Sequence, residues 1–230
     1  MSQSESKRRL ITVVNPRSPV SETYRTLRTN IEFAAIDSAM QVIMVSSAGP
    51  GEGKSTTIAN LAVAFSQSDR KVVLIDADMR KPTAHKTFQI SNRFGLSSVI
   101  SQQSTLQEVI QSTDVPNLDV ITAGPIPPNP AEMLASKRMT ALLDELRTMY
   151  DIVLVDTPPL LAVTDAQIAA TKSDGVVLVV DQGRVKRQFA QKAIQNLQNV
   201  NARILGVVLN NVKRRSNEEA YYYYYSADVK

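Results

Sequence analysis

The sequence predicts an α/β protein with a mostly parallel sheet and helices on both faces. Three observations predict this class. Apolar runs such as 71–75 and 151–155 show no alternation of apolar and polar residues, helical segments separate the runs, and polar residues follow them directly. Runs of this kind are typical of strands buried on both faces of a parallel sheet. Regular alternation of such strands with helices produces a sheet that is covered on both sides. With 230 residues, of which 43% are hydrophobic, the chain is expected to form one domain, 1–230.

The first half of the chain is expected to begin with a polar N-terminal arm over residues 1–17. Ser18-Pro19 then favours a helix start, because serine and proline are common there. The expected elements that follow are a helix from 18 to about 35, a strand at 41–46, a helix at 56–65, a strand at 71–75 and a short helix at 105–110. The pattern is least clear between 85 and 118.

The second half continues the alternation of strands and helices. The expected elements are a strand at 118–122, an extended proline-rich connection at 125–130, a helix at 131–149, a strand at 151–155, a helix from Thr164-Asp165, a strand at 176–180, a helix at 185–199 and a strand at 204–209. Asn129 and Glu132 are the expected cap and third residue of the helix at 131–149.

Residues 48–55, AGPGEGKS, have the pattern of a phosphate-binding loop, G-x-x-x-x-G-K-[ST], with Ala48 in place of the first glycine. A strand-like run precedes the loop and a helical run follows it, which disfavours an ordinary glycine-rich turn. Backbone amides of such a loop converge on phosphate oxygens at a helix N-terminus. Lys54 is expected beside the β- and γ-phosphates of ATP, and the Ser55 hydroxyl on Mg²⁺. The predicted nucleotide-binding residues here are Gly49, Pro50, Gly51, Glu52, Gly53, Lys54, Ser55 and Thr56.

Three aspartates, Asp76, Asp78 and Asp156, follow two of the apolar runs. Ligands of open α/β sheets collect beyond the carboxyl ends of the strands, so these side chains are expected to surround the metal held by Ser55. Magnesium usually takes only one or two protein carboxylates directly. One aspartate can therefore help to hold the metal while another acts as a base. Each could instead be a carboxylate that only solvates the end of a strand.

Five consecutive tyrosines stand close to the end of the chain: Tyr221, Tyr222, Tyr223, Tyr224 and Tyr225. A strand or a helix would turn some of these rings to solvent, so a packed core cannot use all five. Their polar neighbours predict a flexible tail over 216–230. The hydroxyls are either part of a recognition patch or acceptors for a phosphoryl group.

The motifs together resemble those of the bacterial tyrosine kinases, the autokinases of capsular and exopolysaccharide operons. The resemblance rests on the loop at 48–55, VVLIDADMRKP at 72–82, IVLVDTPP at 152–159, GPIPPNP at 124–130, the spacing Glu22-x-x-Arg25-x-x-Arg28 and the tyrosine cluster. It extends from about Pro19 to Tyr225. The first three motifs also mark the wider class of deviant P-loop ATPases, and the last two features narrow the choice.

The resemblance implies a P-loop NTPase fold of the deviant Walker type. It implies an autokinase that uses ATP and Mg²⁺ to phosphorylate the five tail tyrosines, 221–225, between subunits of a homo-oligomeric ring. The implied catalytic residues are Lys54, Asp76 as base, and Asp78. The implied metal ligands are Ser55, Asp78 and Asp156, and the implied oligomerisation residues are Glu22, Arg25 and Arg28. In related ATPases an asparagine near the end of the last strand reads the adenine, which suggests Asn210 or Asn211.

Hydropathy and composition indicate which partners and which location are expected. The chain has no apolar stretch near the ~20 residues that span a bilayer. It therefore resembles the split type of Gram-positive bacteria, in which a separate transmembrane adaptor of the polysaccharide co-polymerase type activates the kinase. The chain is expected to be cytoplasmic and recruited to the inner face of the membrane. A cognate tyrosine phosphatase and protein substrates are further expected partners, and nucleic acid is not expected. The absence of cysteine excludes disulfides and thiolate iron–sulfur sites.

Two other functions stay open. A positioning or partition ATPase switch of the same superfamily would carry a signature lysine at position 49, where this chain has glycine. A non-enzymatic module could bind a partner through the tyrosine tail, but it would not need Lys54, Ser55 and all three aspartates.

Overall fold

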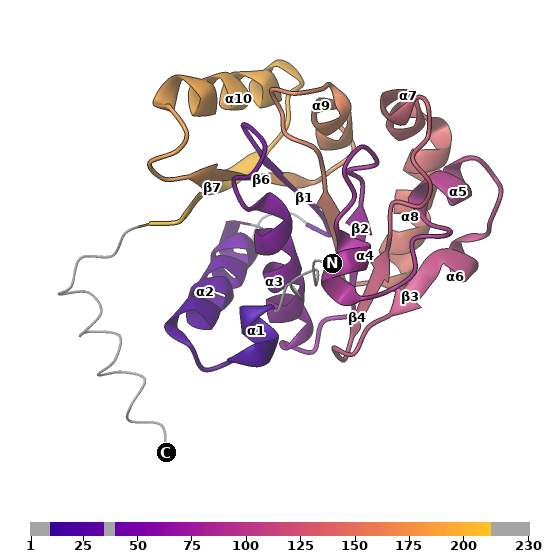
Figure 1. The fold of residues 1–230 in the computed structure, drawn as a ribbon, viewed down its shortest axis with the longest axis horizontal. Coiled ribbons are helices and arrows are strands. Elements are labelled where there is room, and N and C mark those ends of the chain that lie inside the picture. The colour runs from indigo at the N-terminus through magenta and orange to yellow at the C-terminus, as the bar shows by residue number, and fades with distance from the viewer. Residues whose placement is uncertain (1–9, 35–39, 213–230) are drawn as a thin grey trace, which may run out of the picture.

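The computed structural model describes residues 10–34 and 40–212, which form a seven-stranded sheet with helices on both faces (Figure 1). The strands are β1 (Val42–Ser47), β2 (Val72–Asp76), β3 (Ile110–Ser112), β4 (Leu118–Ile121), β5 (Ile152–Asp156), β6 (Gly175–Asp181) and β7 (Ile204–Asn210). Their order across the sheet is β3-β4-β2-β5-β1-β6-β7. Every neighbouring pair is parallel except β3 with β4. The predicted fold class is confirmed.

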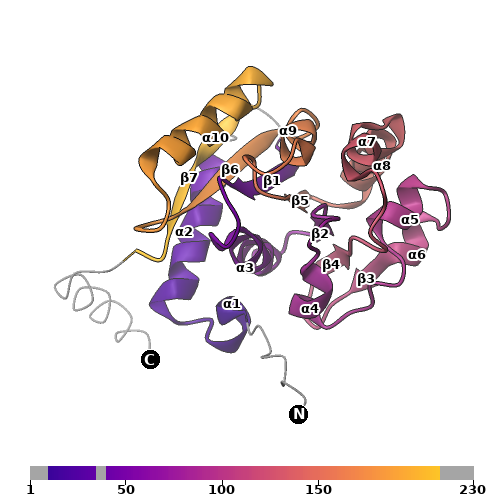
Figure 2. The same ribbon diagram turned by 45° about the horizontal axis from the view of Figure 1, so that its top comes forward.

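Two helical layers cover the sheet. One contains α1 (Ile11–Val14), α2 (Pro19–Ala34), α3 (Lys54–Ser66) and α4 (Ala84–Phe88). The other contains α5 (Leu96–Ile100), α6 (Leu106–Val109), α7 (Pro130–Ala135), α8 (Lys137–Met149), α9 (Asp165–Ala170) and α10 (Arg187–Asn199). Figures 1 and 2 show α1, α2 and α3 together on one face of the sheet, with α9 and α10 on the other.

The central strands are buried on both faces, as their unbroken apolar runs predict. Every residue of β1, β2, β5 and β6 is buried. Burial of one large aliphatic side chain contributes about 1.5–3 kcal/mol, so these strands stabilise the fold substantially. The parallel register pairs Asp76 at the end of β2 with Asp156 at the end of β5. The fold therefore brings the two aspartates to the same edge of the sheet.

The single helix predicted at 131–149 is wrong, because Ser136 divides it into α7 and α8. Ser136 has extended backbone angles, and its Oγ accepts a hydrogen bond from the amide of Met139 at 3.2 Å, which caps α8. As predicted, Asn129 is the N-cap residue of α7. Its side chain makes no capping bond and instead donates to Glu132 Oε2 at 3.0 Å.

The unclear middle of the chain contains more structure than predicted. The helix expected at 105–110 ends at Val109, and the next three residues form β3, antiparallel to β4. The short helices α4 and α5 were not predicted. Each has five residues, which is too short for helical periodicity to be recognised.

Part of the N-terminal arm predicted over residues 1–17 packs on the domain, beginning at Leu10. Leu10 is buried, and the backbone amide and hydroxyl of Thr12 donate to Asn60 Oδ1 on α3 at 3.1 and 2.9 Å. Gln67, just after α3, donates to the Thr12 carbonyl at 3.2 Å. The segment therefore packs on the helix that begins at the phosphate-binding loop. Residues 1–9 lie outside the described part.

Candidate active site

The phosphate-binding loop connects β1 to α3, as predicted. Gly51 and Gly53 have φ angles of 77° and 89°, in the left-handed region that favours glycine. A Cβ at Gly53 would lie 2.1 Å from Asn210 Nδ2, so a side chain does not fit there. Ala48 is not among the residues with positive φ, and it is buried in the core. Alanine is therefore accommodated in place of the first glycine of the motif.

Side chains from three segments hold this loop. The buried Glu52 carboxylate accepts hydrogen bonds from the amides of Gly49 and, at 3.3 Å, Asp181 at the end of β6. Asn210 Nδ2 donates to the Glu52 carbonyl at 2.9 Å, and Arg184 Nη1 donates to the Gly51 carbonyl at 3.2 Å. Burial raises the pKa of Glu52 in spite of the amide hydrogen bonds. Sequence reasoning placed Glu52 in the loop but missed this role, because its partner Asp181 is 129 residues away in the chain.

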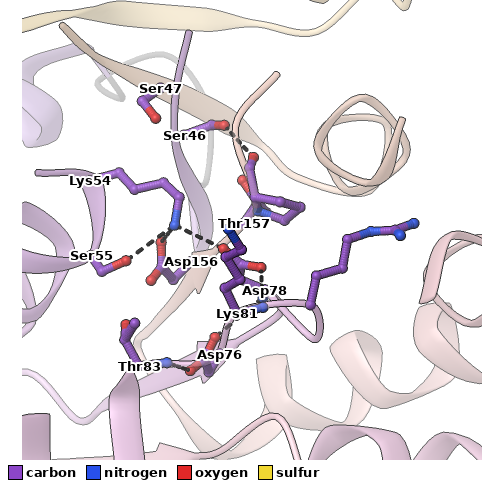
Figure 3. A network of polar contacts seen from close by, with 12 residues as sticks. Ser46, Ser47, Lys54, Ser55, Asp76, Asp78, Lys81, Thr83, Asp156 and Thr157 are labelled. Atoms are coloured by element: carbon purple, nitrogen blue, oxygen red, sulfur yellow. Dashed lines mark hydrogen bonds and ion pairs between the residues drawn. The ribbon is translucent and has the colours of Figure 1, made fainter. Parts of the chain in front are cut away.

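Lys54, the first residue of α3, lies among acidic side chains (Figure 3). Its Nζ is 3.1 Å from Ser55 Oγ, 3.1 Å from Asp78 Oδ2 and 3.5 Å from Asp156 Oδ1. Burial would lower the pKa of Lys54, but Asp156 and Asp78 outweigh this effect and raise it. Lys54 therefore carries a fixed positive charge beside the loop, as its predicted role with phosphate requires.

Asp76 is fully buried at the end of β2. Its Oδ2 accepts hydrogen bonds from the amides of Thr83 and Ala84 at 2.8 and 2.9 Å, and its Oδ1 accepts one from the amide of Asp78 at 3.2 Å. Burial and the charge of Asp156 raise the pKa of Asp76 to about 7, against the effect of those hydrogen bonds. A carboxylate with this pKa can accept and release a proton near neutral pH.

The residues predicted to hold Mg²⁺ converge on one point. Ser55 Oγ, Asp78 Oδ2 and Asp156 Oδ1 all lie around Lys54 Nζ, and burial raises the pKa of Asp156. These are oxygen donors, the kind that Mg²⁺ prefers. Among residues 10–34 and 40–212 there is no group of three or more acidic or histidine side chains that could hold a metal by itself. The donor set fits a Mg²⁺ ion whose remaining ligands are phosphate oxygens and waters.

A second ion pair holds the segment that carries Asp78. Arg80 donates to both carboxylate oxygens of Asp165 at 2.9 and 3.0 Å, and Asp165 is the fully buried first residue of α9. Lys81 donates its amide to Asp78 Oδ1 at 3.0 Å. Sequence reasoning missed the pair, because 85 residues separate its members and no local pattern joins them.

The two asparagines predicted to read adenine lie at the end of β7. Asn210 contacts the phosphate-binding loop as described above, and Asn211 Nδ2 donates to Asp181 Oδ2 at 3.0 Å. The structure thus brings Asn210 to the loop and Asn211 to Asp181 at the end of β6. Their contact with a base stays a prediction.

The predicted oligomerisation residues lie on α2, a helix that precedes the phosphate-binding loop in the chain and is not part of it. Glu22 and Arg25 pair with each other at 2.7 Å, and Arg25 also donates to the Pro16 carbonyl at 2.6 Å. Arg28 donates to the Ala64 carbonyl near the end of α3 at 3.0 Å and lies 3.8 Å from Glu32. The role between subunits stays a prediction.

The predicted phosphoacceptors lie outside the described residues, which end at 212. They are Tyr221, Tyr222, Tyr223, Tyr224 and Tyr225. The tail predicted over 216–230 lies outside the described part as well. Neither the tail nor the role of its hydroxyls is tested by the structure, and both stay predictions.

No helix within the described ranges is long and apolar enough to cross a membrane.

Comparisons with known proteins find relatives that match most of the chain. Residues 40–211 match the family model described as AAA domain. Tyrosine-protein kinase YwqD of Bacillus subtilis is 50% identical over 210 residues, which cover 91% of this chain and 89% of that protein. The crystal structure of the chimerical protein CapA2B2 superimposes with a TM-score of 0.87 at 45% identity, covering 89% of this chain and 90% of that one. The kinase domain of the Escherichia coli tyrosine kinase ETK also superimposes with a TM-score of 0.87, at 36% identity. The match covers 94% of this chain and 85% of that chain.

Proposed function

This chain belongs to the family of bacterial tyrosine-protein kinases and is an enzyme of that class, and we propose that it phosphorylates its own tail tyrosines, Tyr221–Tyr225, between subunits. The observation that carries the proposal is the cluster beside the phosphate-binding loop. It combines a charged lysine, Lys54, with Asp76, a buried carboxylate whose pKa is about 7. The first can stabilise charge on a transferring phosphoryl group, and the second can accept the proton of a phenol.

The reaction follows from these positions. The loop amides and Lys54 would bind the β- and γ-phosphates of ATP, and Ser55, Asp78 and Asp156 would hold Mg²⁺. When bound, the metal neutralises charge on the phosphate oxygens. The tyrosine oxygen forms a bond to the γ-phosphorus as the bond from that phosphorus to the bridging oxygen of ADP breaks, and its electron pair leaves with ADP. Asp76 takes the phenolic proton.

The wider setting is proposed from the same family. Glu22, Arg25 and Arg28 would join subunits into a ring, and a transmembrane adaptor would recruit the ring to the inner face of the membrane. There the kinase would regulate capsular or exopolysaccharide synthesis and export, with a phosphatase and protein substrates as further partners. Each phosphate adds about −1.5 to −2 charge. Repulsion between several phosphates on one tail would loosen the ring.

A mixing experiment in the native cells tests the direction of transfer. One chain carries Lys54→Met with an intact tail, and the other is active but has phenylalanine at all five tail positions. Mass spectrometry of the tail should find phosphate on the Lys54→Met chain only when both chains are present. A tail that is phosphorylated in the wild type but never in the mixture would contradict transfer between subunits. ATP hydrolysis with no phosphotyrosine in the wild type would instead favour the ATPase switch.

A further inference from the structure

Three apolar side chains are exposed where α1 joins α2. Val13 and Val14 of α1 are 47% and 54% exposed, and Val20 at the start of α2 is 48% exposed. Figures 1 and 2 show α1 at the rim of its helical layer, beside the start of α2. Grouped apolar side chains on a surface mark contacts with proteins or membranes, whereas single ones are ordinary. No step of the reaction described above uses these valines.

Hydrogen bonds hold the backbone around these side chains in place. Ser21 Oγ lies 2.7 Å from the carbonyl oxygen of Asn15 and 3.2 Å from that of Ile11. Arg25 Nη2 donates to the Pro16 carbonyl at 2.6 Å. The exposed valines therefore project from an ordered turn, and contact with a partner would not first require this turn to be ordered at a cost in entropy.

The charge beside the valines is positive. Between positions 6 and 21 the sequence has four cations, KRR at 7–9 and Arg17, and no acidic residue. Arg17 is exposed and forms no ion pair with any residue in the described part of the chain. The nearest acidic residues in the chain are Glu5 and Glu22, and Glu22 is paired with Arg25 at 2.7 Å. The cations of this region therefore outnumber the free carboxylates around them.

We propose that this α1–α2 surface, formed by Val13, Val14, Arg17 and Val20, binds directly to the anionic headgroups of a lipid bilayer, together with the cations at 7–9. Apolar side chains beside lysine and arginine are the combination that holds proteins at a membrane interface. The apolar groups enter the headgroup boundary, and the cations are attracted to anionic lipids. Residues 7–9 directly precede Leu10, so chain connectivity keeps them within about 11 Å of that residue.

A second basic triplet provides a comparison within the same chain. KRR at 213–215 follows Val212, which is 48% exposed. This triplet is less suited to an anionic surface, because Glu218 and Glu219 follow closely and phosphates on the tail tyrosines would add further negative charge. The first triplet has no such neighbours up to Glu22. We therefore assign the lipid contact to the α1–α2 surface.

The lipid contact would add to recruitment by a transmembrane adaptor. One cation near an anionic membrane strengthens binding about fivefold, so a few cations give reversible attachment. Stable attachment generally takes two signals. The α1–α2 surface would supply the second signal and would turn this face of the kinase toward the bilayer. The inference goes beyond the proposed function, and lipid binding itself does not depend on phosphoryl transfer.

Sedimentation with vesicles tests the proposal, using the full chain without ATP and without the adaptor. The wild type should bind vesicles of equal parts phosphatidylglycerol and phosphatidylcholine more tightly than vesicles of phosphatidylcholine alone, and salt should weaken this binding. Glutamine at all of 7–9 should weaken it at least about tenfold. Glutamine at all of 213–215 is the matched control and should have a much smaller effect. Equal losses in the two variants, or no preference for phosphatidylglycerol, would overturn the proposal.

A fluorescent reporter locates the contact. The chain has no tryptophan, so Val14→Trp introduces a single one. Its emission should shift to shorter wavelength when phosphatidylglycerol vesicles are added, because the ring enters the headgroup region. Val207→Trp is the control, since Val207 on β7 is 47% exposed, as Val13 is, and its emission should stay unchanged. The same shift in both variants, or none in Val14→Trp, would contradict the proposed surface.

A serine variant separates the membrane from a second copy of the chain as the partner. Val13→Ser combined with Val14→Ser should weaken vesicle binding about tenfold, because less apolar surface leaves water. Sedimentation velocity without vesicles should show an unchanged oligomer. If the variant instead loses its oligomer and still binds vesicles, the valines join copies of this chain and the proposal is wrong. Normal tail phosphorylation with no vesicle binding by the wild type would likewise remove the lipid site and leave the proposed function standing.

Discussion

Two groups of charged residues lie at opposite ends of the sheet, and the pKa of the aspartate in one group shifts down while that in the other shifts up. At the start of β1, Asp174 accepts two hydrogen bonds from Arg147 at 2.7 Å and one each from the amides of Gln41 and Val42 at 2.9 and 2.8 Å. Burial alone would raise the pKa of Asp174, but Arg147 and these amides hold it below its ordinary value. At the other end, burial and a neighbouring carboxylate raise the pKa of Asp76 to about 7.

The difference lies in the balance of charge. Asp174 has a cation of its own, whereas Lys54 is shared by Asp78 and Asp156, and Asp76 lies beside them without an ion pair to any described residue. A balanced pair needs no further partner. A cluster with surplus negative charge is held at a cost in stability and is suited to bind a cation or a proton. Of the two ends, only the second therefore has the electrostatics of an active site.

The largest expected difference is in catalysis. Lys54→Met should lower phosphotyrosine formation by at least about 100-fold, because charge on the transferring group loses its nearest stabiliser. Arg147→Met, the matched change at the other end, should retain activity at temperatures where the protein stays folded. Phosphotyrosine assays at equal amounts of folded protein make the comparison. Comparable losses in the two variants would contradict the division into a reactive and a structural end.

For the free energy of unfolding the order of the two ends should be reversed. The larger loss is expected at the structural end, where Arg147 pairs with Asp174. Arg147→Met leaves Asp174 partly buried without its cation, and the free energy of unfolding should fall by about 1–3 kcal/mol, less than for a fully buried pair. Urea denaturation measures the change. Adding Asp174→Asn to this variant should recover part of the loss, because the unpaired charge is removed. If the double variant is no more stable than Arg147→Met, the unpaired charge is not the cause.

The pH dependence of stability should separate the two aspartates. With metal chelated, the raised pKa of Asp76 stabilises the folded state below about pH 4, and this contribution is lost as the pH rises through about 7. The loss should be roughly 1–3 kcal/mol, and Asp76→Asn should remove it. The lowered pKa of Asp174 acts oppositely, since its contribution is present above the ordinary aspartate pKa and is lost as the pH falls. Denaturant titrations from pH 5 to 8 test the Asp76 effect, and a wild-type profile as flat as that of Asp76→Asn would contradict it.

The smallest effect on subunit stability is expected on the surface of α2. The Glu22–Arg25 pair is solvent-exposed, so Glu22→Ala should change the free energy of unfolding by no more than about 0.5 kcal/mol. If Glu22 joins subunits, the same variant should nevertheless shift the oligomer toward monomer in size-exclusion chromatography. Thr26→Ala, on the same helix but outside the Glu-Arg-Arg spacing, is the control. An unchanged oligomer in the Glu22→Ala variant would remove Glu22 from the interface.

Local patterns allowed much of the fold and of the candidate site to be predicted. The phosphate-binding loop lies where its glycines and Lys54 placed it, and Asp76 and Asp156 lie at adjacent strand ends because both follow buried apolar runs. The positions at which one helix ends and the next begins were harder to predict from the sequence. Ser136 interrupts a continuous helical pattern because its side chain caps α8, and serine also occurs within helices, so the residue type alone did not indicate the break.

The amino-acid pattern alone determined the class of fold, the phosphate-binding loop and the aspartates around it, because each depends on residues that are neighbours in the chain. The tertiary structure decided which charged groups are balanced. Asp76 and Asp174 are the same residue type at opposite ends of the same sheet, and their pKa values move apart because of burial and of partners such as Arg147, which is 27 residues away from Asp174. The contact of Asn210 with Glu52 spans 158 residues and likewise exists only once the sheet has formed.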